Sequence, residues 1–362
     1  MRLILKLGMV VLLLAGASWL GWALLLPLTP QRETFVLLPA GFSSRQIARR
    51  LENNGVIRSS RGFLLLHYLQ RSRTLKAGEY RFQAAESAVQ VLNRLARGDI
   101  YTHTVVIPEG YNIFDVAQAI QQAGLGQADA FLTVARTDLA MVRGFDPQAT
   151  SLEGYLFPDT YEFTRTQSLH DMAQAMVRRF EQEARQLGLL TPSTAGRSSE
   201  KKPAQSVSQP AMDLPAAASA EGVKIHAIVT LASIVEKETA IDKERPLVAS
   251  VYRNRLQRGM ALGADPTVVY AALLNRSYRG TIYQSDLALD SAYNTYRRPG
   301  LPPGPIANAG AASVRAAMNP QPSDYRDFVA DGQGGPRFAA SYEEHTRNVA
   351  AYRRTQHPTV SR

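Results

Sequence analysis

The chain has 362 residues, of which 45% are hydrophobic and 20% are charged, and its formal net charge is +10. This composition is that of a globular protein with a packed core, and the length predicts two or three domains. Because the chain contains no cysteine, disulfides, thiolate nucleophiles and a lipidated cysteine anchor are excluded. The basic charge is compatible with nucleic acid, anionic lipid or an acidic polymer as a partner, or with a solvated surface that binds none.

An apolar segment follows a short basic tail at the amino terminus. Residues 7–28 carry no charge, and a helix of this length can cross a hydrocarbon core of about 30 Å. Residues 15–17 (Ala-Gly-Ala) have the form of a signal-peptide cleavage site, but the apolar run continues past them to Leu26. We therefore predict a cytoplasmic tail at residues 1–6 and an uncleaved transmembrane helix, with the rest of the chain outside the membrane. This topology excludes nucleic acid as a partner.

A repeat follows the apolar segment. The stretches LLPAGFSSRQIARRLENNGV and VIPEGYNIFDVAQAIQQAGL align at a constant offset of 69 residues. Each predicts a β-strand, a Pro/Gly turn, an amphipathic helix and a glycine C-cap, with Ser43 or Ser44 as the N-cap of the first helix. A further strand at residues 77–82 and a helix after it complete a compact α+β module over residues 34–104. This module is either a spacer or a glycan-binding unit.

Helices predominate from residue 105 onward and are joined by long loops. Residues 191–222 are rich in Pro, Ser and Ala, contain no aromatic residue and show no periodicity, which predicts a disordered surface insertion. The stretch YNTYRRPGLPPGPI has too many prolines and glycines for a helix or a central strand, so we predict a rigid irregular loop. Its Tyr293 and Tyr296 either face sugar rings or cover the core, and Asn294 offers a donor and an acceptor to a substrate.

Two glutamates end the apolar stretch SIVEKETA. On a helix over residues 223–239, Glu236 and Glu238 point roughly 160° apart, so both cannot face one cleft. Each is either a carboxyl paired with a nearby base such as Arg245, or a desolvated carboxyl whose raised pKa suits a general acid. Periodicity alone does not say which of the two is the acid. The scattered histidines make a metal site improbable.

Several long motifs, taken together, resemble the MltG/YceG-like family of membrane-anchored endolytic murein transglycosylases. They are LASIVEKETA, SLEGYLFPDTYEF, ADPTVVY, YNTYRRPGLPPGPIANAG and DFVADGQGGPRFAASYEEHTRNV. The resemblance covers nearly the whole chain. It implies an α+β fold in which residues 34–104 are a LysM-like module and residues 105–355, interrupted by the insertion, are a mainly helical, lysozyme-like catalytic domain. It also implies a single-pass protein of the bacterial cytoplasmic membrane with a periplasmic or extracytoplasmic catalytic domain.

The resemblance also implies the chemistry. In that family the catalytic glutamate is the second of the pair, which is Glu238 here. It would protonate the MurNAc–GlcNAc bond within nascent peptidoglycan and then deprotonate the C6 hydroxyl, leaving 1,6-anhydroMurNAc ends and terminating strand elongation. No cofactor and no metal are expected. The implied partners are peptidoglycan strands, the cytoplasmic membrane and peptidoglycan synthases.

The same motifs supply candidate substrate-binding residues. They are Glu153, Tyr155, Tyr161, Asp265, Thr267, Tyr293, Asn294 and Tyr296. The default interpretation of Asp265 is a helix cap. Gly263 and Pro336 depart from the family pattern, in which Gln and His are frequent. One alternative function is a hydrolytic muramidase, whose second carboxyl is Asp265, Glu153 or Asp159. The other is a peptidoglycan-binding scaffold without catalysis.

Overall fold

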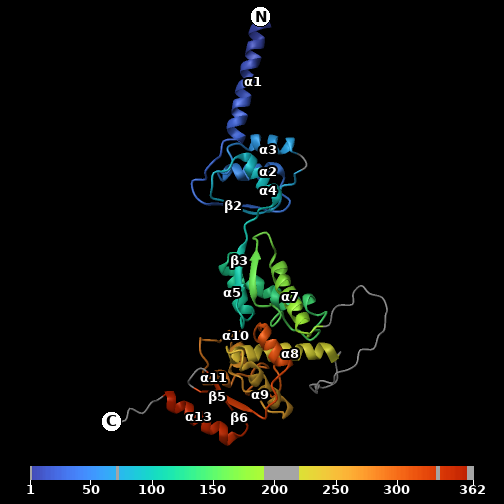
Figure 1. Cartoon of the computed structure of the whole chain (residues 1–362), viewed down its shortest axis with the longest axis vertical. Coiled ribbons are helices and arrows are strands. Elements are labelled where there is room, and N and C mark those ends of the chain that lie inside the picture. Colours follow the sequence, from blue (N-terminus) through green and yellow to red (C-terminus); the bar gives the residue numbers. More distant parts are fainter. Residues whose placement is uncertain (1, 71–72, 191–219, 332–334, 357–362) are drawn as a thin grey trace, which may run out of the picture. The chain divides into compact units, whose positions relative to one another are not determined.

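The computed structural model describes residues 2–70, 73–190, 220–331 and 335–356. The chain divides into two compact units, shown in Figure 1. Unit 1 contains Met1–Val105, Ala123–Leu125 and Tyr161–Ser168, and unit 2 contains Val106–Gln122, Gly126–Thr160 and Leu169–Arg362. The fold is mixed α/β, with helices predominating and the strands of the described residues arranged in three two-stranded sheets. Most of the predicted insertion, residues 191–219, lies outside the described residues.

The first helix, α1 (Arg2–Leu24), is long and apolar enough to cross a membrane. It ends four residues before the predicted limit of the 7–28 span. Pro27 restricts the residue before it to extended conformations, and the backbone of Leu28 exchanges two hydrogen bonds with that of Glu86, at 2.9 and 3.2 Å. The last residues of the apolar segment therefore belong to the folded part of unit 1 rather than to the helix.

Unit 1 contains a small core of aliphatic and aromatic side chains. Strand β1 (Thr34–Leu38) pairs antiparallel with β2 (Gly78–Phe82), which confirms the strand predicted at residues 77–82. Three helices cover the sheet, α2 (Ser44–Asn53), α3 (Ser60–Leu69) and α4 (Ala88–Arg97). Each helix buries apolar side chains in this core, and α2 and α4 expose polar residues on the opposite side, as expected for amphipathic helices.

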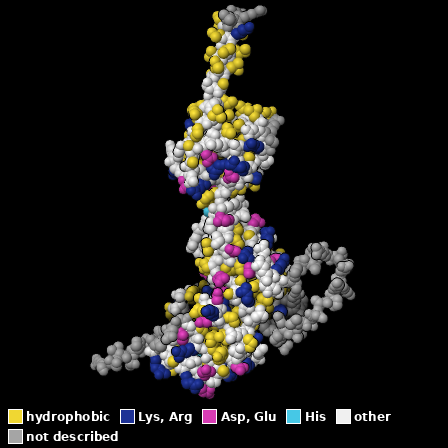
Figure 2. Space-filling view, viewed as in Figure 1, with side chains coloured by type: hydrophobic (Ala, Val, Ile, Leu, Met, Phe, Trp, Pro, Cys, Tyr) yellow, Lys and Arg dark blue, Asp and Glu magenta, His cyan; other side chains and the backbone are white. Residues whose placement is uncertain are grey.

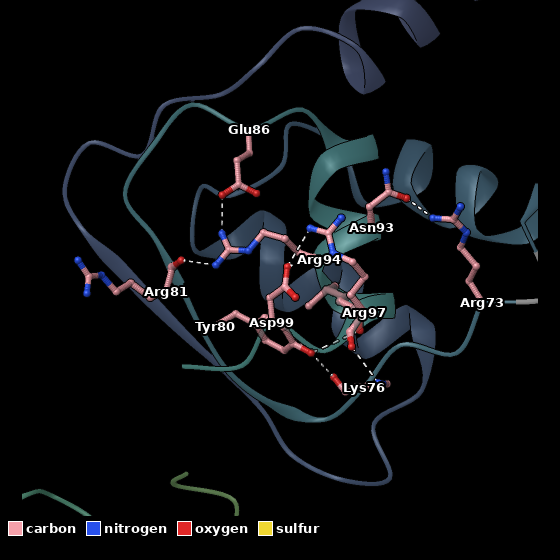
Figure 3. A network of polar contacts seen from close by, with 10 residues as sticks. Arg73, Lys76, Tyr80, Arg81, Glu86, Asn93, Arg94, Arg97 and Asp99 are labelled. Carbon is pink, nitrogen blue, oxygen red and sulfur yellow. Dashed lines mark hydrogen bonds and ion pairs between the residues drawn. The ribbon is translucent and has the colours of Figure 1, made fainter. Parts of the chain in front are cut away.

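A network of polar contacts ties α4 to the chain around β2 (Figure 3). Arg94 forms an ion pair with Glu86 and donates to the carbonyl oxygen of Arg81 over 2.8 Å. In the same last turn of α4, the carbonyl oxygen of Arg97 accepts a hydrogen bond of 2.8 Å from Lys76 Nζ. These bonds tie the last turn of α4 to the chain on both sides of β2, and the Lys76 bond satisfies one of the free carbonyls at the end of the helix.

The second copy of the repeat forms β3 (His103–Ile107) and α5 (Ile113–Gln122), so the strand–turn–helix prediction is confirmed for both copies. The turn glycines adopt the same left-handed conformation, with φ of +84° at Gly41 and +78° at Gly110. Ser43 caps α2 by accepting a hydrogen bond from the Gln46 backbone, as predicted. The shared pattern of glycine, proline and apolar residues in the two copies thus gives the same strand, turn and helix.

Unit 2 is built mainly from helices. The remaining elements are α6 (Ala128–Thr137), a 3-10 turn (Leu139–Met141), β4 (Asp159–Phe163), α7 (Leu169–Gln186), α8 (Ala220–Glu238), α9 (Arg245–Gln257), α10 (Asp265–Leu274), α11 (Gln284–Leu287), α12 (Ala311–Met318), β5 (Asp327–Ala330), β6 (Pro336–Ala339) and α13 (Tyr342–Gln356). Strand β3 pairs with β4, and β5 pairs antiparallel with β6. Helix α8 packs against α9, α10 and α12 (Figure 1).

Helix α8 is the central helix of unit 2 because it is apolar on nearly all sides. Its first residues, 220–222, were predicted to belong to the insertion, and it ends at Glu238, one residue before the predicted limit. The chain between α11 and α12 forms no helix or strand, which confirms the predicted irregular loop. A side chain at Gly154 would place its Cβ 2.5 Å from Pro305 and 2.9 Å from Val229. The glycine thus lets its own segment lie close to both the irregular loop and α8.

Candidate active site

A cavity of about 610 Å³ opens in unit 2 at the carboxyl end of α8. Its lining comes from five parts of the chain: the end of α8, helix α9, the start of α10, the irregular loop, and the carboxyl-terminal segment with β5, β6 and α13. The lining residues include Glu238, Tyr252, Arg255, Asp265, Tyr296 and Phe328. A cavity of this size holds one or two sugar rings, within the usual range for ligand sites.

Glu238 is the last residue of α8 and faces this cavity. The hydroxyl of Tyr252, a buried residue of α9, donates a hydrogen bond of 2.7 Å to Glu238 Oε1. Burial raises the pKa of Glu238 to about 7, and the negative charge of Asp265 adds to this rise, while the Tyr252 bond and the Arg255 charge oppose it. Near neutral pH a large fraction of Glu238 therefore carries a proton that it can donate.

Arg255 lies one turn after Tyr252 on α9 and is held by three acceptors. Its Nη1 donates to the carbonyl oxygen of Leu262 over 2.6 Å, its Nε donates to the carbonyl oxygen of Arg326 over 2.5 Å, and its Nη2 pairs with Asp327 over 2.5 Å. The guanidinium is thus fixed in place by the residues that enter β5. It joins α9 to the carboxyl-terminal segment, whose strands β5 and β6 contribute part of the cavity lining.

Asp265 and Tyr296 form the side of the cavity that the sequence predicted. The Tyr296 hydroxyl donates a hydrogen bond of 2.6 Å to Asp265 Oδ1, and burial together with this bond raises the pKa of Tyr296. Tyr296 is 45% exposed and packs over Gly263, where φ is +57°. The default interpretation of Asp265 as a helix cap is wrong, because Ala264 occupies the N-cap position of α10 and Asp265 follows it.

Thr267 and Asn294 lie beneath this side of the cavity and are buried. The Thr267 hydroxyl donates to the carbonyl oxygen of Ala264 over 2.7 Å and lies 2.9 Å from the hydroxyl of Thr295. Asn294 donates to the carbonyl oxygens of Leu287, at the end of α11, and of Leu289, and it accepts a bond from the Tyr296 backbone. Neither side chain reaches the cavity, and both fix the loop that carries Tyr296.

Three of the predicted substrate-binding residues lie elsewhere in unit 2. Glu153 is 1% exposed and accepts hydrogen bonds from the Ile113 backbone (2.9 Å) and the Asn308 amide (3.3 Å). Burial raises its pKa to about 8. The buried Tyr155 hydroxyl donates to Asp146, and Tyr293 packs against Tyr270 with ring centroids 5.0 Å apart.

The last predicted residue, Tyr161, belongs to unit 1 and stacks on Phe163 at 5.5 Å. Of the eight predicted substrate-binding residues, only Asp265 and Tyr296 line the cavity. The sequence analysis did not identify Tyr252 and Arg255. Their spacing of three residues places them on one face of α9, but the sequence contains no signal that this face meets α8.

Glu236, the other glutamate of the pair, has a different environment. Its Oε1 lies 3.0 Å from Arg245 Nη2, and its Oε2 accepts a hydrogen bond of 3.0 Å from the Gly310 backbone. Both members of the ion pair are 5% exposed at the side chain. The two carboxyls do face different surroundings, as their helical positions predicted, and Glu236 does not line the cavity.

Comparisons with known proteins decide the family. The sequence profile of the YceG-like family matches residues 36–351. The chain belongs to the YceG-like family. This confirms the resemblance found in the motifs, and the two positions that depart from the family pattern, Gly263 and Pro336, both line the cavity.

Two curated relatives and one solved structure give the degree of similarity. A Bacillus subtilis protein named endolytic murein transglycosylase is 30% identical over 94% of this chain and 91% of its own length. A Streptococcus pneumoniae protein of the same name is 26% identical over 91% of this chain and 60% of its own length. The crystal structure of a YceG-like protein from Listeria monocytogenes superposes with a TM-score of 0.54 at 30% identity, covering 87% of this chain and 99% of that chain.

Proposed function

We propose that this protein is an endolytic murein transglycosylase in which Glu238 is the catalytic acid and base. The observation that carries the proposal is a single desolvated carboxyl with a pKa of about 7, oriented by Tyr252 at the edge of a cavity large enough for sugar rings. The names of the two curated relatives support the reaction class and peptidoglycan as the substrate.

The proposed reaction needs one carboxyl that acts twice. Protonated Glu238 donates its proton to the glycosidic oxygen between MurNAc and GlcNAc, and the bond from that oxygen to C1 of MurNAc breaks. The oxocarbenium-like sugar that remains is attacked by its own C6 hydroxyl oxygen, while the Glu238 carboxylate takes the hydroxyl proton. The product is a 1,6-anhydro ring, and no water is consumed. The negative charge of Asp265 on the cavity wall would stabilise the cationic intermediate.

Hydrolysis by a muramidase is the second candidate, since another carboxyl shares the cavity. Of the three alternatives for a water-activating base, Asp265 lines the cavity, Glu153 is buried among polar partners, and Asp159 forms an ion pair with Arg179 at 2.7 Å. Because Asp265 already accepts a hydrogen bond from Tyr296, the transglycosylase is the better supported function.

We propose that α1 anchors the protein in the bacterial cytoplasmic membrane, with the amino terminus in the cytoplasm and both units outside. The module at residues 34–104 is proposed to be LysM-like and the catalytic domain lysozyme-like. Cleavage of nascent strands near the membrane would terminate their elongation and would bring the enzyme close to peptidoglycan synthases.

The test is digestion of purified murein with the full-length protein and with Glu238→Gln, followed by mass spectrometry of the products. Glu236→Gln is the matched control, because it changes a carboxyl on the same helix that does not line the cavity. We expect internal fragments with anhydro ends from the wild type and from the control, and none from Glu238→Gln. Reducing ends would identify a muramidase instead. Equal cleavage by wild type and Glu238→Gln would refute the assigned role of Glu238.

A further inference from the structure

The end of α1 is packed onto unit 1 rather than joined to it by a free linker. Ala23 and Leu24 are buried, at 3% and 8% exposure. A Cβ added to Gly62 of α3 would lie 3.4 Å from side-chain atoms of both residues, so the helices meet in direct contact. Arg58, just before α3, donates to the carbonyl oxygen of Pro27 over 3.0 Å. These contacts fix α3 to the base of α1.

The position of this contact along α1 indicates how deep in the membrane the contact would lie. The apolar span runs over Ile4–Leu24, which is 21 residues. At a rise of about 1.5 Å per residue this span matches a hydrocarbon core of about 30 Å. If α1 is the proposed membrane anchor, Ala23 and Leu24 lie at the outer edge of the hydrocarbon layer. Helix α3, which packs on them, then lies at the interface between lipid and water.

Helix α3 has two apolar faces. Phe63 and Leu66 face the core of unit 1 and are at most 8% exposed, whereas Leu65, Tyr68 and Leu69 are 42%, 59% and 71% exposed on the opposite face. A surface helix in water normally places polar residues on its outer side. Figure 2 shows a yellow hydrophobic area at the end of unit 1 from which α1 leaves, and Figure 1 places α3 at this end. The exposed apolar face thus belongs to a helix that directly contacts the end of α1, at Ala23 and Leu24.

The composition of this outer face matches a lipid interface. Arg61 lies one turn before Leu65 on the same side of the helix and is exposed, and Arg58 lies over the ring of Trp22 with its guanidinium carbon 5.2 Å from the ring centroid. Basic side chains next to an apolar helix face attract anionic lipid headgroups. Tyrosine is enriched at the level of the headgroups because its ring is apolar and its hydroxyl is polar.

We propose that the outer face of α3, formed by Arg61, Leu65, Tyr68 and Leu69, lies in the outer leaflet of the membrane that α1 crosses. Unit 1 is then held against the bilayer by two attachments, the spanning helix and an interfacial helix. The inference rests on the proposed anchoring by α1, and it adds a second lipid contact that restricts rotation of unit 1 about α1. The partner is a bilayer that contains anionic phospholipid.

The test uses fluorophores on single cysteines, which is straightforward because the natural chain has none. Full-length Leu65→Cys, Leu69→Cys, Leu13→Cys and Asp99→Cys are labelled with an environment-sensitive dye and reconstituted into vesicles of phosphatidylethanolamine and phosphatidylglycerol. The vesicles carry nitroxide lipids that quench either at headgroup depth or near the bilayer centre. Leu13 reports the anchor. Asp99 is the control on unit 1, because it follows α4, its side chain is 45% exposed, and it is not part of the apolar face of α3.

We expect headgroup-depth nitroxide to quench the labels at Leu65 and Leu69, deep nitroxide to quench the label at Leu13, and neither to quench the label at Asp99. Quenching at Leu13 but not at Leu65 and Leu69 would leave the anchor intact and overturn the proposed lipid contact. Absence of quenching at Leu13 would overturn both. If aqueous iodide fails to reach Leu65 and Leu69 while nitroxide lipids also fail to quench them, a protein surface covers α3 and the proposal is wrong.

Discussion

Glu236 and Glu238 lie two residues apart at the end of one helix, and both carboxyls are withdrawn from bulk water. Glu236 accepts hydrogen bonds from the Arg245 guanidinium and the Gly310 backbone. Glu238 accepts its bond from a neutral hydroxyl, that of Tyr252, and faces a cavity. Glu236 is therefore paired with a cation, whereas desolvation stabilises the neutral form of Glu238. The same residue type thus serves as a buried ion-pair partner at one position and as the proposed proton donor at the other.

The largest expected difference between the two sites is in catalysis. Glu238→Gln removes the proposed acid, and the loss of a general acid typically lowers the rate by about 10² to 10⁴. Glu236→Gln should keep the specific activity of its folded fraction within a few-fold of wild type. Rates of anhydro-end formation, normalised to folded protein, measure both. A loss of comparable size in Glu236→Gln would mean that the two carboxyls act as one unit.

The reverse difference is expected in stability. Glu236→Gln leaves the buried Arg245 without one of its partners, and breaking a buried ion pair costs about 3 to 5 kcal/mol. The lower end of this range is expected because Arg245 also pairs with Asp242. Denaturant unfolding of the full-length protein in detergent gives the value. Glu238→Gln is the control and should not be destabilised, so a larger loss there would contradict the proposed surroundings of the two residues.

The dependence of stability on pH should also separate the two variants. The folded-state pKa of Glu238, about 7, lies above its ordinary value of 4.5. The stabilisation of the fold that this raised pKa provides is therefore fully present below pH 4.5 and is lost as the pH rises through 7. A rise of this size corresponds to about 3 kcal/mol. Glu238→Gln should be more stable than wild type above pH 7 and should lack this part of the slope, whereas an unchanged slope would mean that Glu238 is not desolvated.

The smallest expected effect is a shift in the pH dependence of activity. Because the protonated form of Glu238 is required, activity should fall as the pH rises through about 7. Tyr252→Phe removes a bond that lowers the Glu238 pKa. The variant should therefore lose activity at a higher pH than wild type, by about one unit or less. Asp265→Asn removes a charge that raises the Glu238 pKa, so this variant should lose activity at a lower pH than wild type. Shifts in the same direction for both variants would refute this account of the carboxyl.

Local features of the fold were predictable from the sequence because they depend on neighbouring residues. The repeat predicted two strand–turn–helix units, and Gly41 and Gly110 adopt matching left-handed turns. The two turns differ in what they touch. A Cβ at Gly41 would meet nothing within 4 Å, while the Gly110 backbone bonds Asn308 and Lys237. Sequence similarity between the copies could not reveal that only the second turn is held by α8 and its neighbouring loop.

By itself, the sequence determined the apolar span, the repeat, the irregular loop and the opposite orientation of the two glutamates, since these follow from composition and helical period. Only the tertiary structure decided which residues share the cavity. Tyr252 approaches Glu238 through the packing of α9 on α8, and Asp265 is brought to Tyr296 by hydrogen bonds among buried side chains of α10 and the loop. Such contacts depend on the packing of distant segments, and so does the desolvation that raises the Glu238 pKa. A local pattern carries no information about either.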